Sequence, residues 1–560
     1  MAENEPMPKM LRAWLAGAIL AVGVVFVFVV FQAARMTELG DVRAMDIAQV
    51  ARNIAAGKGF TTYFIRPLSL AQVPDVDNHP DLVYAPLHPY FMSLVFRAFG
   101  ASVRTISWSS GIPFLLTIPL VFWLGVTAFS RKVGMLSALV LATNAVALTV
   151  AVSGTEGALL GFFFTLLCGV LLAHYNRASA RVPLAALAGL LTAALYLTHF
   201  LWIVAFAPVL LVLMLNTPQR QRAVNVLAFL VVFAVVVTPW FYRMYRLTGN
   251  PLHNLSSYEI ISNTRTYPGN VVLRSYEKHP PGVASFIVNS PREVYERARD
   301  LAIGTYPLLF AITGLVIMPF FIVASIVPLG NAGMDRLRLG LYLLTVLLFI
   351  GLSLMSADAR LLLPLAPIMT VVCVAFFYQL LDLRLRPLTE RLRARWTTTA
   401  VTLLVMLHIV PLFLQLAPGR PMPPTVPMAV RRASQELNAL IPQASGREPS
   451  PLAVVSDMPW AIAWYANRPA IWLPRDDVSL RRMEQDVGQI RWMVLTPQIM
   501  DMASSEQAGG WAELWRRAVL KAPMVGGWRV RQTFANGRWV LLERVADVAS
   551  VGTLPSGPSR

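Results

Sequence analysis

The sequence predicts a polytopic α-helical membrane protein with a small α/β domain at its C-terminal end. Hydrophobic residues make up 56% of the 560 residues, and charged residues only 14%. Apolar runs recur along the chain at about the length, roughly 20 residues, that a helix needs to cross a hydrocarbon core. After Pro418 the apolar runs stop, and short β-type and α-type segments alternate. This composition excludes an ordinary soluble protein of this length.

Eleven apolar segments are predicted to span the membrane. They cover residues 11–33, 104–129, 133–152, 157–175, 183–199, 201–215, 223–243, 303–329, 337–355, 360–381 and 397–416. The segment 85–100 is too short to span and predicts an interfacial or partly inserted helix. The first segment has no convincing cleavage site after it, so we interpret it as a retained anchor rather than a signal peptide.

Basic residues fall in alternate connections between these segments. They are Arg131 and Lys132, Arg177 and Arg181, Arg220 and Arg222, Arg336 and Arg338, and the arginines of 384–395. Because Lys and Arg concentrate on the cytoplasmic side, we expect the N-terminus in the cytoplasm. With an odd number of spans, loops 34–84 and 245–301 and the C-terminal domain are then extracytoplasmic. The same bias explains the net charge of +18, so we expect no nucleic-acid partner.

The predicted domain boundaries follow from these patterns. A membrane region at 1–417 is followed by a Pro-rich linker at 418–427, an α/β domain at 428–545 and a disordered tail at 546–560. Within the domain, strands are expected at 452–457, 470–474 and 491–496, and helices at 428–440, 458–466 and 480–487. The segments WRVRQTF and RWVLLERV flank Ala-Asn-Gly and predict a β-hairpin.

The first outer loop contains a polar helix at 41–56 that ends in a glycine-rich turn at 57–59. A period of 3.6 residues places Asp46, Gln49 and Asn53 on one face and apolar residues on another. Such a helix is suited to the membrane surface, where Asp46 could act as a general base. A solvated carboxylate on a surface helix is the alternative.

Further along this loop, acidic residues and a histidine cluster within seven positions: Asp75, Asp77, His79 and Asp81. Carboxylates and an imidazole could hold a divalent metal ion, the one cofactor that the sequence leaves possible. The spacing matches no specific metal-binding loop, and an ordinary solvated loop has the same composition.

Ionisable residues stand at the outer ends of several predicted spans: Glu156, His199, Arg243 and Arg360. Charges at membrane depth are costly and therefore favour a functional role. The two arginines could pair with a lipid phosphate, or could simply extend to the interface. The loop 245–301, with Tyr258 and Lys278 among its aromatic and basic residues, suits sugar and phosphate recognition.

Several motifs together resemble the GT-C membrane glycosyltransferases, in the protein-mannosyltransferase-like and aminoarabinose-transferase-like branch (glycosyltransferase family 39-type). They are ARNIAAGKGF, APLHPYFMSLVFRAFG, TPWFYRMYRLTGNPLHNL, ARLLLPLAP and VVSDMPWAIAWYANRPAIWLP, in the order that those enzymes show. His88 stands where the branch usually has Tyr. The branch places its catalytic Asp about nine residues before the Arg of ARN, and that position is Arg43 here.

The resemblance implies inverting transfer of a sugar from a polyprenyl-phosphate donor to a lipid, glycan or protein acceptor of the cell envelope, outside a bacterial-type inner membrane. It implies a catalytic Asp in the first outer loop, either Asp46 or Asp41, since both flank Arg43. Substrate contacts are then expected from the basic, polar and aromatic residues of the outer loops and span ends: Arg52, Lys58, His88, Glu156, His199, Arg243, Tyr258, Lys278 and Arg360. A transporter or flippase, and a non-catalytic subunit of envelope glycan assembly, are the alternative functions.

Overall fold

A computed structural model describes residues 9–35, 39, 41–314, 316–417, 428–441, 453–506, 510–520, 524–525 and 527–545. The chain forms two compact units. Unit 1 comprises residues 1–60, 81–260 and 286–425, and unit 2 comprises 61–80, 261–285 and 426–560. Unit 2 thus takes in two segments of the predicted outer loops besides the C-terminal region. The expected linker at 418–427 and tail at 546–560 lie outside the described residues.

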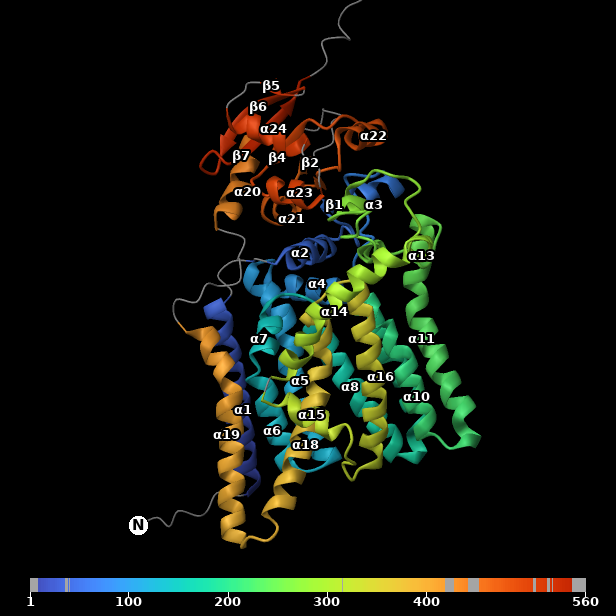
Figure 1. The fold of residues 1–560 in the computed structure, drawn as a ribbon, viewed down its shortest axis with the longest axis vertical. Helices are drawn as coiled ribbons and strands as arrows, with labels where there is room; N and C mark the ends of the chain where they lie inside the picture. The colour runs from blue at the N-terminus through green and yellow to red at the C-terminus, as the bar shows by residue number, and fades with distance from the viewer. Residues whose placement is uncertain are drawn as a thin grey trace, which may run out of the picture. The chain divides into compact units, whose positions relative to one another are not determined.

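Unit 1 is built from helices, and its long helices run roughly lengthwise beside one another (Figure 1). The α-helices of unit 1, long and short, are α1 (Lys9–Arg35), α2 (Val42–Ala55), α4 (Leu87–Phe99), α5 (Val103–Ala128), α6 (Arg131–Ala142), α7 (Ala145–Val152), α8 (Gly157–Asn176), α9 (Arg181–Thr198), α10 (Phe206–Asn216), α11 (Gln219–Thr248), α14 (Pro291–Thr313), α15 (Met318–Ala324), α16 (Ala332–Leu354), α17 (Ala359–Leu362), α18 (Ala366–Leu385) and α19 (Glu390–Leu416). Helix α13 (Val283–Asn289) begins in unit 2 and ends in unit 1.

The described helices include seven that are long and apolar enough to cross a membrane, or up to nine if each of two bent pairs counts as one span. The pairs are α6 with α7, bent by 57°, and α14 with α15, bent by 97°. Two of the eleven predicted spans coincide with the shorter apolar helices Ala21–Arg35 and Phe200–Asn216. The seven long helices, the two bent pairs and these two shorter helices together fall on the eleven predicted segments, and seven to nine of the described spans are long and apolar enough to count as full candidates. The protein remains a multi-pass membrane protein.

The two bent pairs meet at their breaks. Asn144 caps α7 by accepting the backbone N–H of Ala147 at 3.0 Å. Its amide nitrogen donates at 2.8 Å to the carbonyl of Ile312, in the last turn of α14. A broken helix leaves backbone groups without intrahelical partners, and in an apolar environment these must be satisfied inside the protein. One side chain here serves the ends of both interrupted helices.

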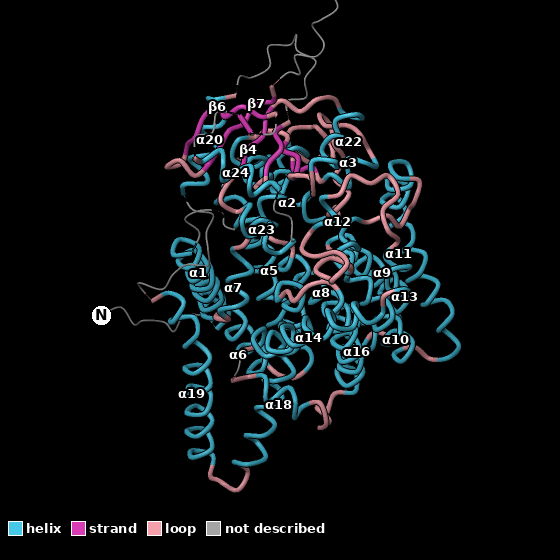
Figure 2. The backbone as a smooth tube through the Cα atoms, turned by 45° about the horizontal axis from the view of Figure 1, so that its top comes forward, coloured by secondary structure: helices cyan, strands magenta, loops and turns pink. Residues whose placement is uncertain are grey.

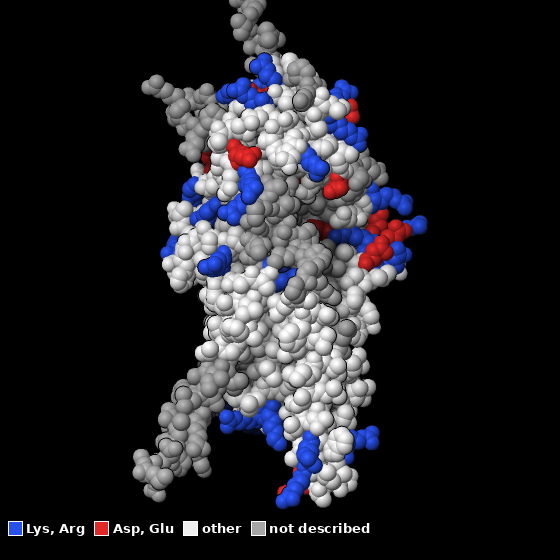
Figure 3. All heavy atoms as spheres, turned by 90° about the vertical axis from the view of Figure 1, so that its left-hand side faces the viewer, with Lys and Arg blue, Asp and Glu red and all other residues white. Residues whose placement is uncertain are grey.

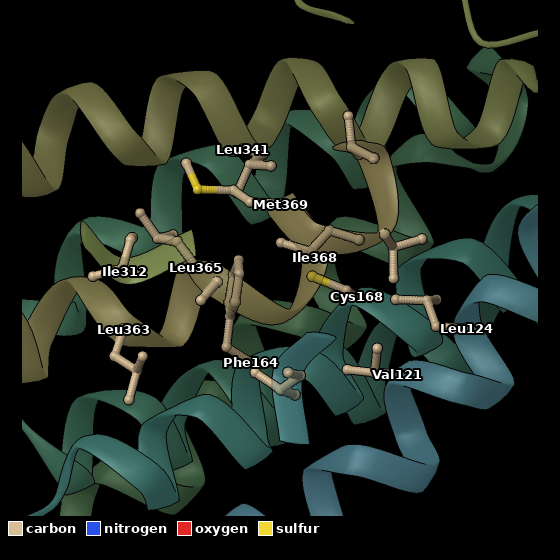
Figure 4. Packing of buried hydrophobic residues seen from close by; sticks show 14 of the residues in the cluster. Val121, Leu124, Phe164, Cys168, Ile312, Leu341, Leu363, Leu365, Ile368 and Met369 are labelled. Carbon is tan, nitrogen blue, oxygen red and sulfur yellow. The ribbon is translucent and has the colours of Figure 1, made fainter. Parts of the chain in front are cut away.

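Helix α18 lies at the centre of unit 1. Within the most apolar stretch of Ala359–Leu385, 94% is buried, whereas within that of Glu390–Leu416 only 17% is buried, which places α19 at the edge of unit 1. Figure 4 shows Ile368 and Met369 of α18 packed with Phe164 of α8, Leu341 of α16 and side chains of α5. The sequence of α18 is apolar on all sides, and a helix of this kind is expected to be buried at the centre of a bundle.

On the face shown in Figure 3, the lower end carries mainly Lys and Arg, and the surface directly above it is nearly free of charged side chains. Arginines near the start of α16 satisfy carbonyls at or just beyond the C-terminal ends of other helices. Arg336 donates to the carbonyl of Leu215 at 2.6 Å, and Arg338 donates to that of Val327 at 2.6 Å. A cation at a helix C-terminus is favoured by the helix dipole and by the unpaired carbonyls there.

Unit 2 is a mixed sheet with helices, and every strand that the structure describes belongs to it (Figure 2, strands in magenta). The strands are β1 (Phe64–Ile65), β2 (Val454–Ser456), β3 (Ala470–Trp472), β4 (Trp492–Leu495), β5 (Met524–Val525), β6 (Trp528–Phe534) and β7 (Trp539–Arg544). The helices are α3 (Pro67–Gln72), α12 (Val271–Arg274), α20 (Met428–Leu440), α21 (Pro459–Ala461), α22 (Asp477–Val487), α23 (Ile499–Glu506) and α24 (Gly510–Val519).

The strand order is β1-β3-β2-β4-β7-β6-β5. The first four strands are parallel to one another, and β7, β6 and β5 continue the sheet antiparallel. The structure confirms the three strands, the helix at Met428–Leu440 and the hairpin of β6 and β7 that the sequence predicts. Strand β1 comes from the first outer loop and pairs with β3 (Phe64 with Ala470), and sequence patterns do not predict it because it has only two residues.

Candidate functional site

Helix α2 is fixed at its start by Asp41, the N-cap residue. Oδ1 of Asp41 accepts hydrogen bonds from the backbone N–H groups of Arg43 at 2.8 Å and Ala44 at 3.1 Å. An Asp in this position satisfies N–H groups that have no partner within the helix. Oδ2 of the same carboxylate lies 2.9 Å from the guanidinium of Arg360. Asp41 therefore both caps α2 and ties it to α17.

Arg43, in the first turn of α2, pairs with the end of another helix. Its Nη2 lies 2.8 Å from Oε1 of Glu156, which stands immediately before α8. Nε2 of His199, at the end of α9, lies 3.9 Å from the same oxygen. The ring of Tyr84 supports the guanidinium of Arg43, at 5.5 Å from ring centre to carbon. Residues from three separate helix ends and one loop converge here.

The turn before α8 that presents Glu156 is held in place by its neighbours. The N–H of Gly154 donates to Oγ of Ser110 at 2.9 Å, and its carbonyl lies 3.1 Å from Nε2 of His88. Gly154 has φ of +79°, and a Cβ at this position would lie 2.2 Å from the side chain of Ile106. Only glycine therefore fits this turn.

Arg360 completes the group from the other side. It pairs with Asp358 at 2.8 Å, and the carboxylate of Asp358 also caps α17 by accepting the N–H of Arg360 at 2.9 Å. The α8 turn packs directly against this segment, since a Cβ on Gly157 would lie 2.7 Å from the carbonyl of Arg360. We call the group Asp41, Arg43, Glu156, His199, Asp358 and Arg360 the ionic cluster.

Glu156 is ionised within this cluster. Burial alone would raise the pKa of its carboxyl, but Arg43, His199 and Arg360 outweigh burial and lower the pKa to about 2. Burial likewise favours the neutral form of Arg43, yet the carboxylate of Glu156 keeps the pKa of Arg43 above its ordinary value. Opposite charges in contact stabilise each other strongly in a medium of low polarity. The pair is therefore a true ion pair.

The structure brings together four of the predicted site residues, Asp41, Glu156, His199 and Arg360, with His88 next to them. Asp46 lies elsewhere on α2. Its side chain is fully buried and accepts a hydrogen bond from the amide of Gln49 at 3.1 Å. Gln49 and Asn53 are buried as well, so the polar face of α2 is packed inside the protein.

The other predicted substrate contacts are dispersed. Arg243 donates to the carbonyls of Phe60 at 3.1 Å and Asp81 at 3.3 Å and lies over the ring of Trp240. Lys278 belongs to unit 2, where it pairs with Asp486 at 2.9 Å. Arg52 is half-buried near the end of α2, and Lys58 is exposed beyond that end. Tyr258 is buried in a short 3₁₀ turn.

The candidate metal ligands of the first outer loop are used in local structure. Asp75 accepts the N–H groups of Asp77 and Asn78, and Asp81 accepts those of Val83 and Tyr84. The ring of His79 is bonded to Oγ of Ser69 at 2.8 Å and to the carbonyl of Asp75 at 2.9 Å, and burial lowers its pKa to about 4. In the described part of the chain, no three His, Cys, Asp or Glu side chains form a group that could hold a metal ion.

Sequence reasoning does not place Arg43 and Asp358 among the site residues. For Arg43 the available signal is its position, where the resembling enzymes have their catalytic Asp. In unit 2 it also misses Asp457, which is fully buried directly after β2 and accepts the hydroxyl of Thr496 at 2.7 Å. Burial raises the pKa of the Asp457 carboxyl to about 7. An acidic residue at the end of a buried parallel strand is the signal that points to it.

Solved structures share this architecture. ArnT from Cupriavidus metallidurans bound to undecaprenyl phosphate matches with a TM-score of 0.59 and 14% identity, over 97% of this chain and 99% of that one. ArnT in the apo state matches with a TM-score of 0.56 and 14% identity, over 98% and 100% of the two chains. The oligosaccharyltransferase AglB from Archaeoglobus fulgidus, in complex with an inhibitory peptide and a dolichol-phosphate, matches with a TM-score of 0.56 and 12% identity, over 87% of this chain and 71% of that one.

No protein-family model and no curated protein sequence matches the chain. The likeness to ArnT and AglB is one of fold, and it extends over nearly the whole chain. The protein thus has the fold of the GT-C membrane glycosyltransferases. This confirms, at the level of fold, the resemblance that the sequence motifs indicate.

Proposed function

We propose that the protein is an integral-membrane glycosyltransferase that moves a sugar from a polyprenyl-phosphate donor to a glycan, lipid or protein acceptor, with inversion at the sugar carbon. The observation that carries this proposal is the ionic cluster, which joins the first-loop helix α2 to the ends of α8, α9 and α17. It lies in a fold shared with proteins whose structures contain undecaprenyl phosphate or a dolichol-phosphate. The site is proposed to face the extracytoplasmic side of a bacterial-type inner membrane.

Each cluster residue has a proposed role in one displacement step. The acceptor hydroxyl oxygen attacks the anomeric carbon, the bond from that carbon to the phosphate oxygen breaks, and the electron pair leaves with the phosphate. Arg360 and Arg43 offer guanidinium groups to the leaving phosphate, for which their planar geometry is suited. The hydroxyl proton passes to a carboxylate acting as general base.

Asp41 is the better candidate for that base. Its side chain is 36% exposed and lies against Arg360, whereas Asp46 is fully buried against Gln49. A base must reach the proton that it removes, which favours the accessible carboxylate. Asp46 remains the second candidate of the first outer loop.

The donor set does not fit a divalent metal ion. Each of the three carboxylates of the cluster is paired with a guanidinium: Asp41 and Asp358 with Arg360, and Glu156 with Arg43. The two guanidinium charges offset two of the three carboxylate charges, and every carboxylate already contacts a cation, so the proposed step is not routed through a metal.

The test is sugar transfer by the purified full-length protein in lipid nanodiscs, with a panel of labelled undecaprenyl-phosphate sugars and an envelope lipid extract as acceptor. We expect transfer by the wild type, a loss of about 100-fold or more in Asp41→Asn, and no loss in the exposed control Asp382→Asn. Full activity in both Asp41→Asn and Asp46→Asn would refute the mechanism. A wild type that neither binds nor turns over any donor would instead indicate a non-catalytic subunit or a transporter.

A further inference from the structure

His88 is held in a defined tautomer by the turn that carries Glu156. Its side chain is 1% exposed, and its Nε2 lies 3.1 Å from the carbonyl oxygen of Gly154. A carbonyl only accepts hydrogen bonds, so Nε2 carries the proton. In the neutral ring, Nδ1 is then a lone-pair acceptor. This nitrogen is buried and has no hydrogen-bond partner among the described residues.

Burial of His88 outweighs its charged neighbours and keeps the ring neutral. Burial lowers its pKa most; the carboxylate of Glu156 and the Gly154 carbonyl act in the opposite sense, and Arg43 adds to the lowering. The net pKa is below the ordinary value. The ring therefore presents an acceptor rather than a second donor at neutral pH.

Glu156, two residues after Gly154 in the same turn, adds further acceptor capacity. Both of its oxygens are buried and accept no well-aligned hydrogen bond within the described structure, although Oε1 makes the ion pair with Arg43. His199 does not fill the gap. Its Nδ1 accepts the N–H of Leu201 at 3.2 Å, so Nε2 carries the proton, but that nitrogen lies 3.9 Å from Oε1, beyond hydrogen-bonding distance.

In the described part of this site, three buried acceptor atoms, Nδ1 of His88 and both oxygens of Glu156, thus stand against one buried donor without a hydrogen-bond partner, Nε of Arg43. Buried acceptors without donors are rare in folded proteins and call for an explanation. The missing partner must donate hydrogen bonds and must be small enough to reach a buried turn. Sugar hydroxyl groups have this chemistry, whereas a phosphate, which only accepts from its surroundings when ionised, does not.

We propose that Nδ1 of His88 and the carboxylate of Glu156 accept hydrogen bonds from hydroxyl groups of the donor sugar. This inference rests on the proposed glycosyltransferase function and specifies which part of the donor is recognised here. The phosphate is left to the guanidinium groups of Arg43 and Arg360. His88 is in this view a specificity residue for the sugar ring, not for the lipid.

Two substitutions separate the ring nitrogens of His88. His88→Gln keeps a donor amide near the position of Nε2, so the bond to Gly154 can persist, but it removes the acceptor at Nδ1. His88→Asn places an amide oxygen near the position of Nδ1 and gives up the bond to Gly154. Loss of the acceptor and loss of the structural bond can therefore be measured independently, with thermal unfolding of each variant as the check on folding.

The experiment measures binding of two probes to the full-length protein in nanodiscs: undecaprenyl phosphate, and the undecaprenyl-phosphate sugar that the wild type transfers best. We expect His88→Gln to weaken binding of the sugar-linked probe by about 10-fold and to leave the bare lipid within about two-fold. His88→Asn should retain more of the sugar-linked affinity. A donor analogue that lacks the recognised hydroxyl should bind the wild type more weakly by the same factor of about 10. It should bind His88→Gln no more weakly than the complete donor does, because the hydrogen bond is already lost in that variant.

Three other results would overturn the inference. Wild-type affinity of His88→Gln for the sugar-linked probe would show that no sugar hydroxyl uses Nδ1, for instance because a buried water does. An equal loss for both probes would show a purely structural role. If the wild type transfers no sugar at all, the proposed function fails, and this inference fails with it. The first two results leave the proposed function intact.

Discussion

The strongest consequence of the ionic cluster concerns the Arg43–Glu156 pair. Replacing Glu156 by Gln keeps the shape of the side chain but leaves the guanidinium of Arg43, whose side chain is 22% exposed, without its nearest counter-charge. The pKa of the Glu156 carboxyl falls from 4.5 to about 2 in spite of burial, which corresponds to about 3 kcal/mol in favour of the ionised pair at about 1.4 kcal/mol per pKa unit. Removal of one partner of a buried pair generally costs about 3–5 kcal/mol, in agreement with this value.

We therefore expect Glu156→Gln to lower the free energy of opening of α2 by about 3 kcal/mol. Arg43→Met should have a similar effect, because it leaves the carboxylate uncompensated. The double variant should lose about 3 kcal/mol less than the sum of the two single variants, since neither charge then remains buried alone.

The assay is amide hydrogen exchange of the α2 peptides, read by mass spectrometry on the purified protein. Exchange reports local opening free energies, so it isolates α2 from the unfolding of the other helices. The exposed pair Arg517–Glu513 is the matched control, because a surface ion pair contributes about 0–1 kcal/mol. Additive effects of the two Arg43–Glu156 substitutions, or single effects no larger than those of the control pair, would refute the interpretation of a buried, mutually dependent pair.

Three further predictions concern packing and titration. The folded state favours the protonated form of Asp457, because the pKa of this carboxyl is raised from 3.8 to about 7. The wild type should therefore lose stability as pH rises between these values, by at most about 4 kcal/mol. Asp457→Asn should remove this dependence, as measured by hydrogen exchange of β2 and β4 from pH 4 to pH 8. Arg274→Met should destabilise unit 2 by about 2–3 kcal/mol, because the buried guanidinium of Arg274 donates to the carbonyls of Leu473 at 2.7 Å and Pro474 at 3.2 Å. This loss of stability should appear as faster limited proteolysis of the C-terminal region. Gly189→Ala should lower the thermal unfolding midpoint and reduce the free energy of unfolding by about 1–3 kcal/mol, because the new Cβ would lie 2.4 Å from the carbonyl of Phe229. Gly23→Ala is the control: its Cβ would have nothing within 4 Å, so the midpoint should not change.

Local patterns predict most of the helices and several strands. Residues 428–440 form α20 as expected, and the Ala-Asn-Gly sequence turns β6 into β7. These elements depend on near neighbours in the chain, such as alternation of side chains or a turn residue at positive φ. The bends within two of the apolar segments are not predicted. Asn144 lies at the break between α6 and α7, but hydropathy does not reveal this break because the partner of its side chain, the carbonyl of Ile312, is remote in sequence.

The candidate site is predicted in part. The cost of charge near the membrane singles out Glu156, His199 and Arg360 individually, but it does not say which of them meet. Asp41 and Arg360 are 319 positions apart and form one ion pair. Asp46, which helix periodicity makes the more attractive carboxylate, is instead buried beside Gln49. Periodicity describes which residues share a face, and it cannot say what covers that face.

The sequence by itself determined that this is a multi-pass membrane protein with a C-terminal α/β region, since both properties follow from hydropathy and from short-range periodicity. It also indicated the GT-C fold through motifs in a fixed order. Only the tertiary structure decided that Asp41, Arg43, Glu156, His199, Asp358 and Arg360 form one cluster, and that β1 leaves its loop to join the sheet. The physical reason is that ion pairs and parallel strands join segments that are distant in sequence, and their partners are fixed by packing of the whole chain.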